Sequence, residues 1–359
     1  MPTTKKKIIL ISGVATFWGQ QVAAKLTAIP GLHVIGIDNE TPEKDIKDLD
    51  FIQTDIRNPL LTELVRNENV DAACHLAFEE SARPNEASFD YNVMGAMKFF
   101  GACAEAGVRK IVLKSSSMVY GAHHTNPAFI TEDHPLRGSR RYGYTRDMVE
   151  IEAFCNGFRR QHPQILVSIL RFANIVGPNA DTPFTRFLRS QKTPVLLGFD
   201  PMIQVIHEQD VVDALVHAIL TDVPGVFNLA AEGALPLWRA LGLAGKTPLP
   251  VLHLLPYWSS SILGSKQTEY LPIEPDYLRY RWVTDLARMK EEFGFTPHYN
   301  APEALREFAG QQRMRHYLPQ AAARAYDEER LRDTIERRKR AREAAAAQEP
   351  ASRTRGKKS

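Results

Sequence analysis

The stretch Lys7–Asp38 decides the fold of this chain. It begins Lys-Ile-Ile-Leu-Ile-Ser-Gly-Val-Ala-Thr-Phe-Trp-Gly and ends Leu-His-Val-Ile-Gly-Ile-Asp. The unbroken apolar run Ile8–Ile11 is typical of a strand buried on both faces of a parallel sheet. Apolar residues then recur at helical spacing up to Pro30, and a second apolar run ends in Asp38. The order strand, turn, helix, strand predicts a βαβ unit.

The turn that contains Gly13 and Gly19 predicts a phosphate-binding site. A glycine-containing turn between strand and helix directs backbone N–H groups and the positive end of the helix at a phosphate. Asp38 follows Gly19 by 19 residues, where a carboxylate can accept hydrogen bonds from both hydroxyls of an adenosine ribose. Because this carboxylate would repel a 2′-phosphate, the sequence predicts NAD as cofactor in preference to NADP. The alternative is an α/β core that binds no nucleotide.

The charge of the chain is unevenly distributed. Its 359 residues include 45 Lys+Arg and 42 Asp+Glu, a net charge of +3. Residues 313–359 hold 14 of the basic and 7 of the acidic residues, which leaves 31 basic and 35 acidic residues in the rest. A mildly acidic body does not favour binding to the phosphates of a nucleic acid, so we expect no nucleic-acid partner.

The three cysteines indicate a reducing compartment. Cys74, Cys103 and Cys155 lie in apolar contexts without a C-x-x-C pair, which predicts buried thiols in a cytoplasmic protein. The apolar run Ile8–Ile11 is too short for a signal peptide and is needed as a strand. No run of about 20 apolar residues exists, so we expect no transmembrane helix.

Apolar runs alternate with helical patterns along the first half of the chain. This rhythm predicts an α/β fold, a Rossmann-type doubly wound parallel sheet. After Pro178 the pattern becomes irregular and proline-rich, which indicates a smaller C-terminal substrate lobe over the carboxyl ends of the strands. The expected divisions are an NAD-binding domain at 1–178, to which 204–231 returns; a substrate-binding lobe at 179–203 and 232–312; and a basic tail at 313–359, helical and then disordered.

Two segments allow more than one interpretation. Leu249–Gly264 is apolar and fits a lid or packing segment, or else a patch that contacts lipid. The basic tail fits a solvated helix with a disordered end, or a segment that docks on a membrane surface or a partner subunit. The adjacent residues His123 and His124 lack a third ligand, so no metal site is expected.

Several motifs together resemble the extended short-chain dehydrogenase/reductase superfamily, specifically its NAD-dependent epimerase/dehydratase group. The resemblance covers about Lys7–Ala309 and is more specific for the fold than for the substrate. In family order the motifs are Ser12–Gly19, Asp38, Asp55–Arg57, His75–Ala77, Asn92–Gly95, Ser115–Gly121, Tyr142–Arg146, Arg171–Pro178 and His207–Val211.

The resemblance implies catalytic roles for Ser116, Tyr142 and Arg146. Tyr142 matches the acid/base that exchanges a proton with the substrate, and Ser116 matches the serine that hydrogen-bonds the reacting oxygen. A free tyrosine titrates near pH ~10, so the phenol needs a nearby cation to act near neutral pH. The cofactor residues implied by the family are Gly13, Thr16, Phe17, Trp18, Gly19, Asp38, Asp55, Ile56, Leu76, Ala77, Asn92, Tyr142, Arg146 and Phe172.

The chain departs from the family pattern at three positions. The family's Tyr-x-x-x-Lys is here Tyr142-x-x-x-Arg146, in which a guanidinium replaces the ammonium one helical turn from the phenol. Thr16 replaces the middle glycine of the phosphate turn. Ile203 stands where nucleotide-sugar enzymes of the group carry an arginine for the substrate diphosphate. The residues after Ser116 also lack the acid that sugar dehydratases place there.

The sequence therefore predicts an NAD-dependent oxidoreductase or epimerase that moves hydride at a secondary alcohol or ketone of a small, sugar-like substrate. The alternatives are a catalytically weak NAD-binding scaffold or sensor, and a sterol- or lipid-alcohol dehydrogenase. Family members often pair two long helices into a homodimer, which we also expect here. The predicted substrate residues are Phe78, Glu79, Ser116, Asn174 and His207.

The turn itself generates a first prediction. Thr16→Gly restores the family residue and removes a side chain where the backbone meets the pyrophosphate, so NAD affinity should stay equal or rise. Titration of the purified variant with NAD measures this. Loss of NAD binding would show that the pyrophosphate turn is placed wrongly.

Overall fold

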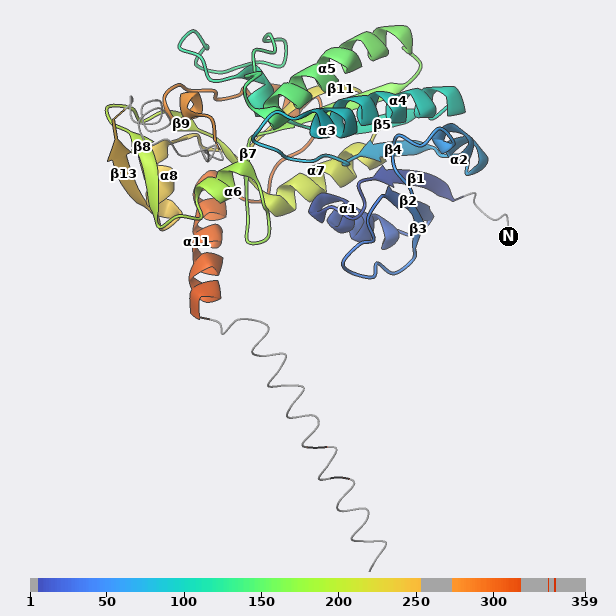
Figure 1. Ribbon diagram of the computed structural model, residues 1–359, viewed down its shortest axis with the longest axis horizontal. Helices are drawn as coiled ribbons and strands as arrows, with labels where there is room; N and C mark the ends of the chain where they lie inside the picture. Colours follow the sequence, from blue (N-terminus) through green and yellow to red (C-terminus); the bar gives the residue numbers. More distant parts are fainter. Residues whose placement is uncertain (1–5, 253–272, 318–334, 336–338, 340–359) are drawn as a thin grey trace, which may run out of the picture. The chain divides into compact units, whose positions relative to one another are not determined.

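The predicted parallel sheet is present, and it has seven strands in the computed structural model (Figure 1). The strand order is β11-β6-β5-β4-β1-β2-β3, and every neighbouring pair is parallel. The order reverses between β4 and β1, which places a crevice there at the carboxyl ends of the strands. The strands are β1 (Lys7–Ser12), β2 (Leu32–Asp38), β3 (Leu49–Gln53), β4 (Ala72–His75), β5 (Lys110–Ser116), β6 (Leu166–Phe172) and β11 (Gly225–Leu229).

The structure describes residues 6–252, 273–317, 335 and 339. Most of the apolar segment Leu249–Gly264 and most of the basic tail lie outside the described residues. The chain divides into two units, Met1–Ala309 and Gly310–Ser359, and all seven sheet strands belong to the first. In the described part, no helix combines the length and the apolar character needed to cross a bilayer.

Helices cover both faces of the sheet, which explains the continuous apolar strands. Figure 1 shows α4 and α5 on one face, and α1 and α7 on the other. Each face has its own buried apolar cluster, and strand residues alternate between the two clusters: Leu10 faces one and Ile9 faces the other. The helices are α1 (Phe17–Thr27), α2 (Leu61–Asn67), α3 (Glu86–Phe89), α4 (Gly95–Ala106), α5 (Gly143–Gln161) and α7 (Glu208–Leu220).

The helical segment from Glu86 to Ala106 contains an irregular turn. α3 leads into a π-helical turn at Asp90–Met94, and α4 continues from there. A π turn adds a residue to the helical spiral and commonly occurs at functional sites. Here it holds Asn92, whose side chain is completely buried.

Several small elements lie outside the main sheet. β7 (Asn174–Val176) pairs with β10 (Val205–His207), so the segment after residue 204 first pairs with β7 and only later joins the main sheet as β11. The other elements are α6 (Pro183–Phe187), β8 (Lys192–Leu196), β9 (Met202–Ile203), β12 (Leu235–Pro236), α8 (Leu237–Leu243), β13 (Thr247–Val251), α10 (Ala287–Glu291) and α11 (Ala301–Tyr317).

A buried ion pair joins the sheet to α5. Arg171 on β6 donates two hydrogen bonds to Glu152 Oε2, at 2.9 Å from Nε and 2.6 Å from Nη2. Its Nη1 also donates to Tyr120 Oη at 2.6 Å and to the Glu132 carbonyl oxygen at 2.9 Å. Because hydrogen bonds surround this buried guanidinium, the cost of removing it from water is offset.

Two glycine-to-alanine substitutions should have opposite effects on stability. A Cβ at Gly19 would lie 2.1 Å from the Gly13 carbonyl oxygen, whereas a Cβ at Gly101 in α4 meets no described atom within 4 Å. We expect Gly101→Ala to raise the free energy of unfolding by about 0.5–1 kcal/mol. Gly19→Ala should lower it by about 1–3 kcal/mol, since backbone must shift. Urea unfolding measures both; a neutral Gly19→Ala would contradict the close contact.

Candidate active site

The turn after β1 packs directly against the end of β4. Gly13 has φ +76°, and a Cβ there would lie 2.5 Å from the Ala77 amide nitrogen and the Leu76 carbonyl carbon. Only glycine permits both this backbone angle and this approach. The predicted residues Gly13, Leu76 and Ala77 are therefore brought together at the crevice between β1 and β4.

Thr16 is the N-cap of α1. Its hydroxyl accepts a hydrogen bond from the Gly19 amide at 3.1 Å and donates to the Gly13 carbonyl oxygen at 2.7 Å. This gives the departure from glycine a structural reason, because a threonine cap stabilises a helix start. The amides of Phe17 and Trp18 have no acceptor in the described part of the chain, and they remain available to a phosphate.

Asp38 lies at the end of β2, beside the same turn. Its carboxylate accepts hydrogen bonds from the Ala15 amide at 2.9 Å and the Glu40 amide at 3.1 Å. These bonds fix the carboxylate next to α1, while its remaining lone pairs can bind ribose hydroxyls. The close turn, the two unbonded amides and this acid together fit an adenine dinucleotide.

Asp55 and Ile56 line the next strand end. Both carboxylate oxygens of Asp55 accept hydrogen bonds from Arg57, at 2.9 Å from Nε and 2.6 Å from Nη2. These bonds lower the pKa of Asp55, so it remains charged. Ile56 is buried against α4, where a Cβ at Gly95 would lie 2.5 Å from its Cδ1.

A pocket opens at the carboxyl ends of β5 and β6. It is lined by the predicted residues Ser116, Phe172 and Asn174. Ser116 Oγ accepts a hydrogen bond from the Met118 amide at 3.2 Å. Asn174 Nδ2 donates to the Gln204 carbonyl oxygen at 2.9 Å. The structure thus gathers three predicted site residues at one edge of the sheet.

Tyr142 lines an adjoining pocket and precedes the first residue of α5. Its hydroxyl donates to the Ile273 carbonyl oxygen at 3.4 Å. Arg146, one turn later, donates to Asp147 Oδ1 from Nε at 2.8 Å and to the Asn85 carbonyl oxygen at 3.1 Å. The guanidinium that replaces the family's lysine is thereby bound to a buried acid.

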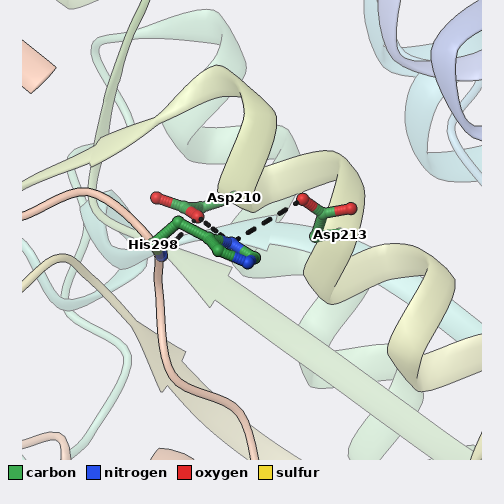
Figure 2. A group of neighbouring side chains, drawn as sticks. All are labelled: Asp210, Asp213 and His298. Carbon is green, nitrogen blue, oxygen red and sulfur yellow. Dashed lines mark hydrogen bonds and ion pairs between the residues drawn. The ribbon is translucent and has the colours of Figure 1, made fainter.

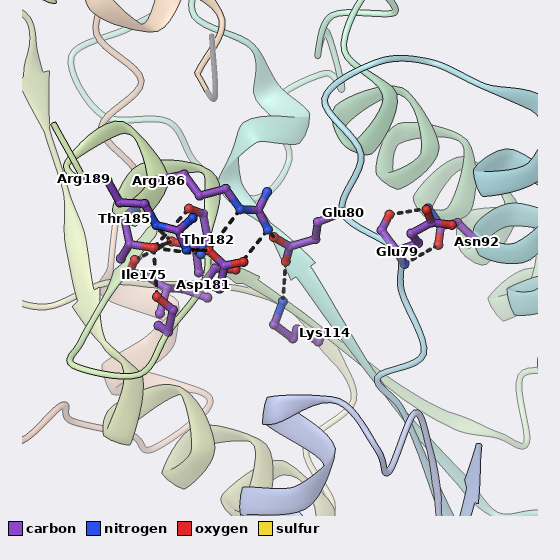
Figure 3. Close-up of polar contacts among 11 residues, drawn as sticks. Glu79, Glu80, Asn92, Lys114, Ile175, Asp181, Thr182, Thr185, Arg186 and Arg189 are labelled. Carbon is purple, nitrogen blue, oxygen red and sulfur yellow. Dashed lines mark hydrogen bonds and ion pairs between the residues drawn. The ribbon is translucent and has the colours of Figure 1, made fainter. Parts of the chain in front are cut away.

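Asn92 links three parts of the site. Its Oδ1 accepts from the Glu79 amide at 2.8 Å, and its Nδ2 donates to the Glu79 carbonyl oxygen at 3.0 Å and to Asp147 Oδ2 at 2.9 Å. The predicted cofactor residue Asn92 therefore positions the loop after β4 against α5. Glu79 itself is exposed, and its backbone provides these contacts (Figure 3).

Two other predicted substrate residues lie apart from the pocket of Ser116. Phe78 packs edge-on against His75, with ring centroids 4.6 Å apart. His207 is buried at the start of α7, where Nδ1 accepts from the Gln209 amide at 3.2 Å. Its ring packs on Tyr299 at 4.0 Å. Neither residue lines the two pockets described above.

The sequence interpretation missed four titratable residues that line these pockets: Glu80, Lys114, Tyr144 and Arg186. Burial raises the pKa of Glu80 and lowers that of Lys114, and each opposes the other's shift through its charge. Burial also raises the pKa of the Tyr144 phenol well above its usual range. The available signal was Lys114, a charged residue directly after the apolar run Ile111–Leu113 of β5.

Asp210, Asp213 and His298 form a separate cluster of potential metal ligands (Figure 2). Asp210 Oδ1 accepts from the His298 amide at 2.7 Å, and its Oδ2 from the Tyr299 amide at 3.2 Å. Asp213 is paired with Lys25 on α1. These contacts account for both carboxylates: Asp210 joins α7 to the segment before α11, and Asp213 joins α7 to α1.

Comparisons with known proteins show which family and which fold the chain resembles. The model of the NAD dependent epimerase/dehydratase family matches residues 9–230. An uncharacterized protein of Mycobacterium tuberculosis is 36% identical over 313 residues, which cover 84% of this chain and 83% of the relative.

Solved structures share the fold at low sequence identity. UDP-glucose 4-epimerase from Thermotoga maritima with UDP-glucose has a TM-score of 0.66 and 20% identity, with 86% of this chain and 99% of that chain covered. A dTDP-glucose 4,6-dehydratase from Bacillus anthracis in complex with NAD has a TM-score of 0.65 and 19% identity, with coverage of 86% and 97%.

The Asn92–Asp147 contact yields a pH-dependent prediction. Asn92→Asp replaces a donor with a second carboxylate 2.9 Å from Asp147 Oδ2, and the pair can be accommodated only if it shares a proton. The folded state then binds a proton that the unfolded chain releases, so its stability falls as pH rises. We expect a loss of about 2–3 kcal/mol at pH 8 and a smaller loss at pH 5.

Urea unfolding at both pH values measures this effect. Asn67→Asp on the exposed end of α2 is the control, and it should change the unfolding free energy by less than about 0.5 kcal/mol. An equal loss at both pH values would contradict the shared proton.

Proposed function

The chain belongs to the NAD-dependent epimerase/dehydratase family, and from this membership we propose that it is an enzyme that moves hydride at a secondary alcohol or ketone. The substrate is a small hydroxylated molecule, such as a sugar. The observation that carries the proposal is that Ser116 and Tyr142 line two adjoining pockets, which share Glu80, Met118 and Tyr144. The turn of Gly13–Gly19 and Asp38 would hold NAD.

NAD, when bound, supplies the hydride acceptor or donor. The residues of the chain handle the proton. Ser116 orients the reacting oxygen through its hydroxyl, and Tyr142 takes the hydroxyl proton as the alcohol becomes a ketone, or returns it in reduction. Arg146 supplies positive charge one helical turn from Tyr142, which favours the phenolate.

A specific observation favours the alternative of a weakly active NAD-binding scaffold. The Arg146 guanidinium lies 2.7 Å from Asp147 Oδ1, so its charge is largely balanced by a buried acid. A balanced guanidinium stabilises a phenolate less than a free ammonium would. The other alternative, a dehydrogenase that acts on lipid-like alcohols, is supported by Ile203 in β9. Its side chain is buried and uncharged.

Two substitutions separate the enzyme from the scaffold. Tyr142→Phe should lower kcat by about 10²–10⁴-fold while NADH binding is retained, because only the proton transfer is lost. Arg146→Lys should keep or raise kcat. The measurement is NAD reduction with a pool of hydroxylated metabolites, alongside NADH titration. Tyr280→Phe, outside both pockets, serves as control. If neither change alters NAD reduction while NAD still binds, the scaffold is correct.

A further inference from the structure

Lys114 is an unusual buried cation. It lies near the end of β5, is 3% exposed, and lines the pocket that contains Ser116. An ammonium group has three donors, yet Lys114 donates no hydrogen bond to any described residue. Its Nζ lies 3.9 Å from Glu80 Oε1 and 5.3 Å from the centroid of the Trp18 ring.

The other two cations that are buried in the described part of the chain, Lys110 and Arg171, have several hydrogen-bond acceptors. Lys110, on the same strand and the same face of the sheet, donates to the carbonyl oxygens of Ile219 and Thr221 and to Asp222. Arg171 is surrounded by acceptors, as described above. An unbonded ammonium in a buried site is costly. Lys110 and Arg171 thus have hydrogen-bond acceptors within the protein. The Lys114 ammonium, which lines the pocket, has none among the described residues.

Glu80 lies between Lys114 and a second cation (Figure 3). Its Oε2 is 3.6 Å from Arg186 Nη2, and its Oε1 is 3.9 Å from Lys114 Nζ. Both distances exceed the hydrogen-bond range of up to ~3.2 Å. Glu80 Oε2 is buried and has no hydrogen-bond partner in the described part of the chain. One carboxylate therefore spans two cations without binding closely to either.

The surrounding charges leave a positive balance. Arg186 also contacts Asp181 at 3.1 Å, and Asp181 pairs with Arg189. The connected set of Lys114, Glu80, Arg186, Asp181 and Arg189 has three cations and two acids, as Figure 3 shows. Burial also raises the pKa of Glu80, so this carboxyl can be neutralised by a proton when another anion approaches.

We propose that Lys114, which lines the Ser116 pocket, and Arg186, which lines the adjoining Tyr142 pocket, form an oxyanion subsite on either side of Glu80, and that this subsite binds a carboxylate or phosphate group carried by the substrate. The subsite rests on the proposed function, because it assigns an acidic substituent to the substrate of that same pocket. The phosphates of the dinucleotide are the other possible source of an oxyanion. They have their own donors in the turn amides of Phe17 and Trp18, so the subsite is assigned to the substrate.

The test uses paired probes that differ by one acidic group. Full-length protein loaded with NADH is titrated calorimetrically with UDP-glucuronate against UDP-glucose, and with glucuronate against glucose. We expect the acidic member of at least one pair to bind about 10- to 100-fold more tightly, the range for hydrogen bonds to charged groups. Lys114→Met should remove this preference and leave NADH affinity within about twofold.

Two further variants control the experiment. Lys192→Met removes an exposed lysine on β8 and should keep the preference. The double variant Lys114→Met with Glu80→Gln carries no charge at either position, so neither substitution leaves the other charge without its partner. Thermal unfolding of this variant shows whether a loss of binding reflects unfolding. The combined variant should fold and should also lack the preference.

Three outcomes would overturn the subsite. One is equal binding of the acidic and neutral probes, and another is failure to bind any acidic probe while NADH binds normally. A third is a loss of NADH affinity in Lys114→Met that is as large as its loss of affinity for the acidic probe. This result would assign Lys114 to the phosphates of the cofactor. Failure of the wild-type protein to bind NADH would instead remove the proposed function itself.

Discussion

The close backbone contact between the turn after β1 and the end of β4 is the constraint on which the site depends. Gly13 and Gly19 allow the turn, the start of α1 and the Leu76–Ala77 backbone to meet without intervening side chains. This contact places the amides at the helix start beside the carboxyl ends of β4 and β5. The dinucleotide crevice and the pocket of Ser116 therefore lie close together, because β1, β4 and β5 are adjacent strands of the sheet.

Buried polar groups around this crevice fall into two kinds. Asn92, Glu152 and Arg171 have their hydrogen-bonding capacity used within the protein, and they fix helices and loops against the sheet. The Lys114 ammonium and Glu80 Oε2 have no hydrogen-bond partner among the described residues. A buried polar group without a hydrogen-bond partner lowers the stability of a folded protein. Such groups are therefore expected at functional sites, where a ligand can supply the missing partner.

The strands and the cofactor turn could be predicted because local patterns specify them. The apolar run Ile8–Ile11, the glycines of the turn and the acid at Asp38 each constrain only nearby backbone. The π turn around Asn92 was not predictable, because it arises from tertiary contacts of that side chain with Glu79 and Asp147. Helical periodicity alone describes the same segment as one regular helix.

The sequence by itself determined the fold class, the dinucleotide unit and the presence of Ser116 and Tyr142 at strand and helix ends. Only the tertiary structure decided which charged residues line the two adjoining pockets. It selected Glu80 instead of its neighbour Glu79, and it joined Lys114 on β5 with Arg186 on α6. The physical reason is that charges act through space, and residues distant in sequence become neighbours only when the chain folds.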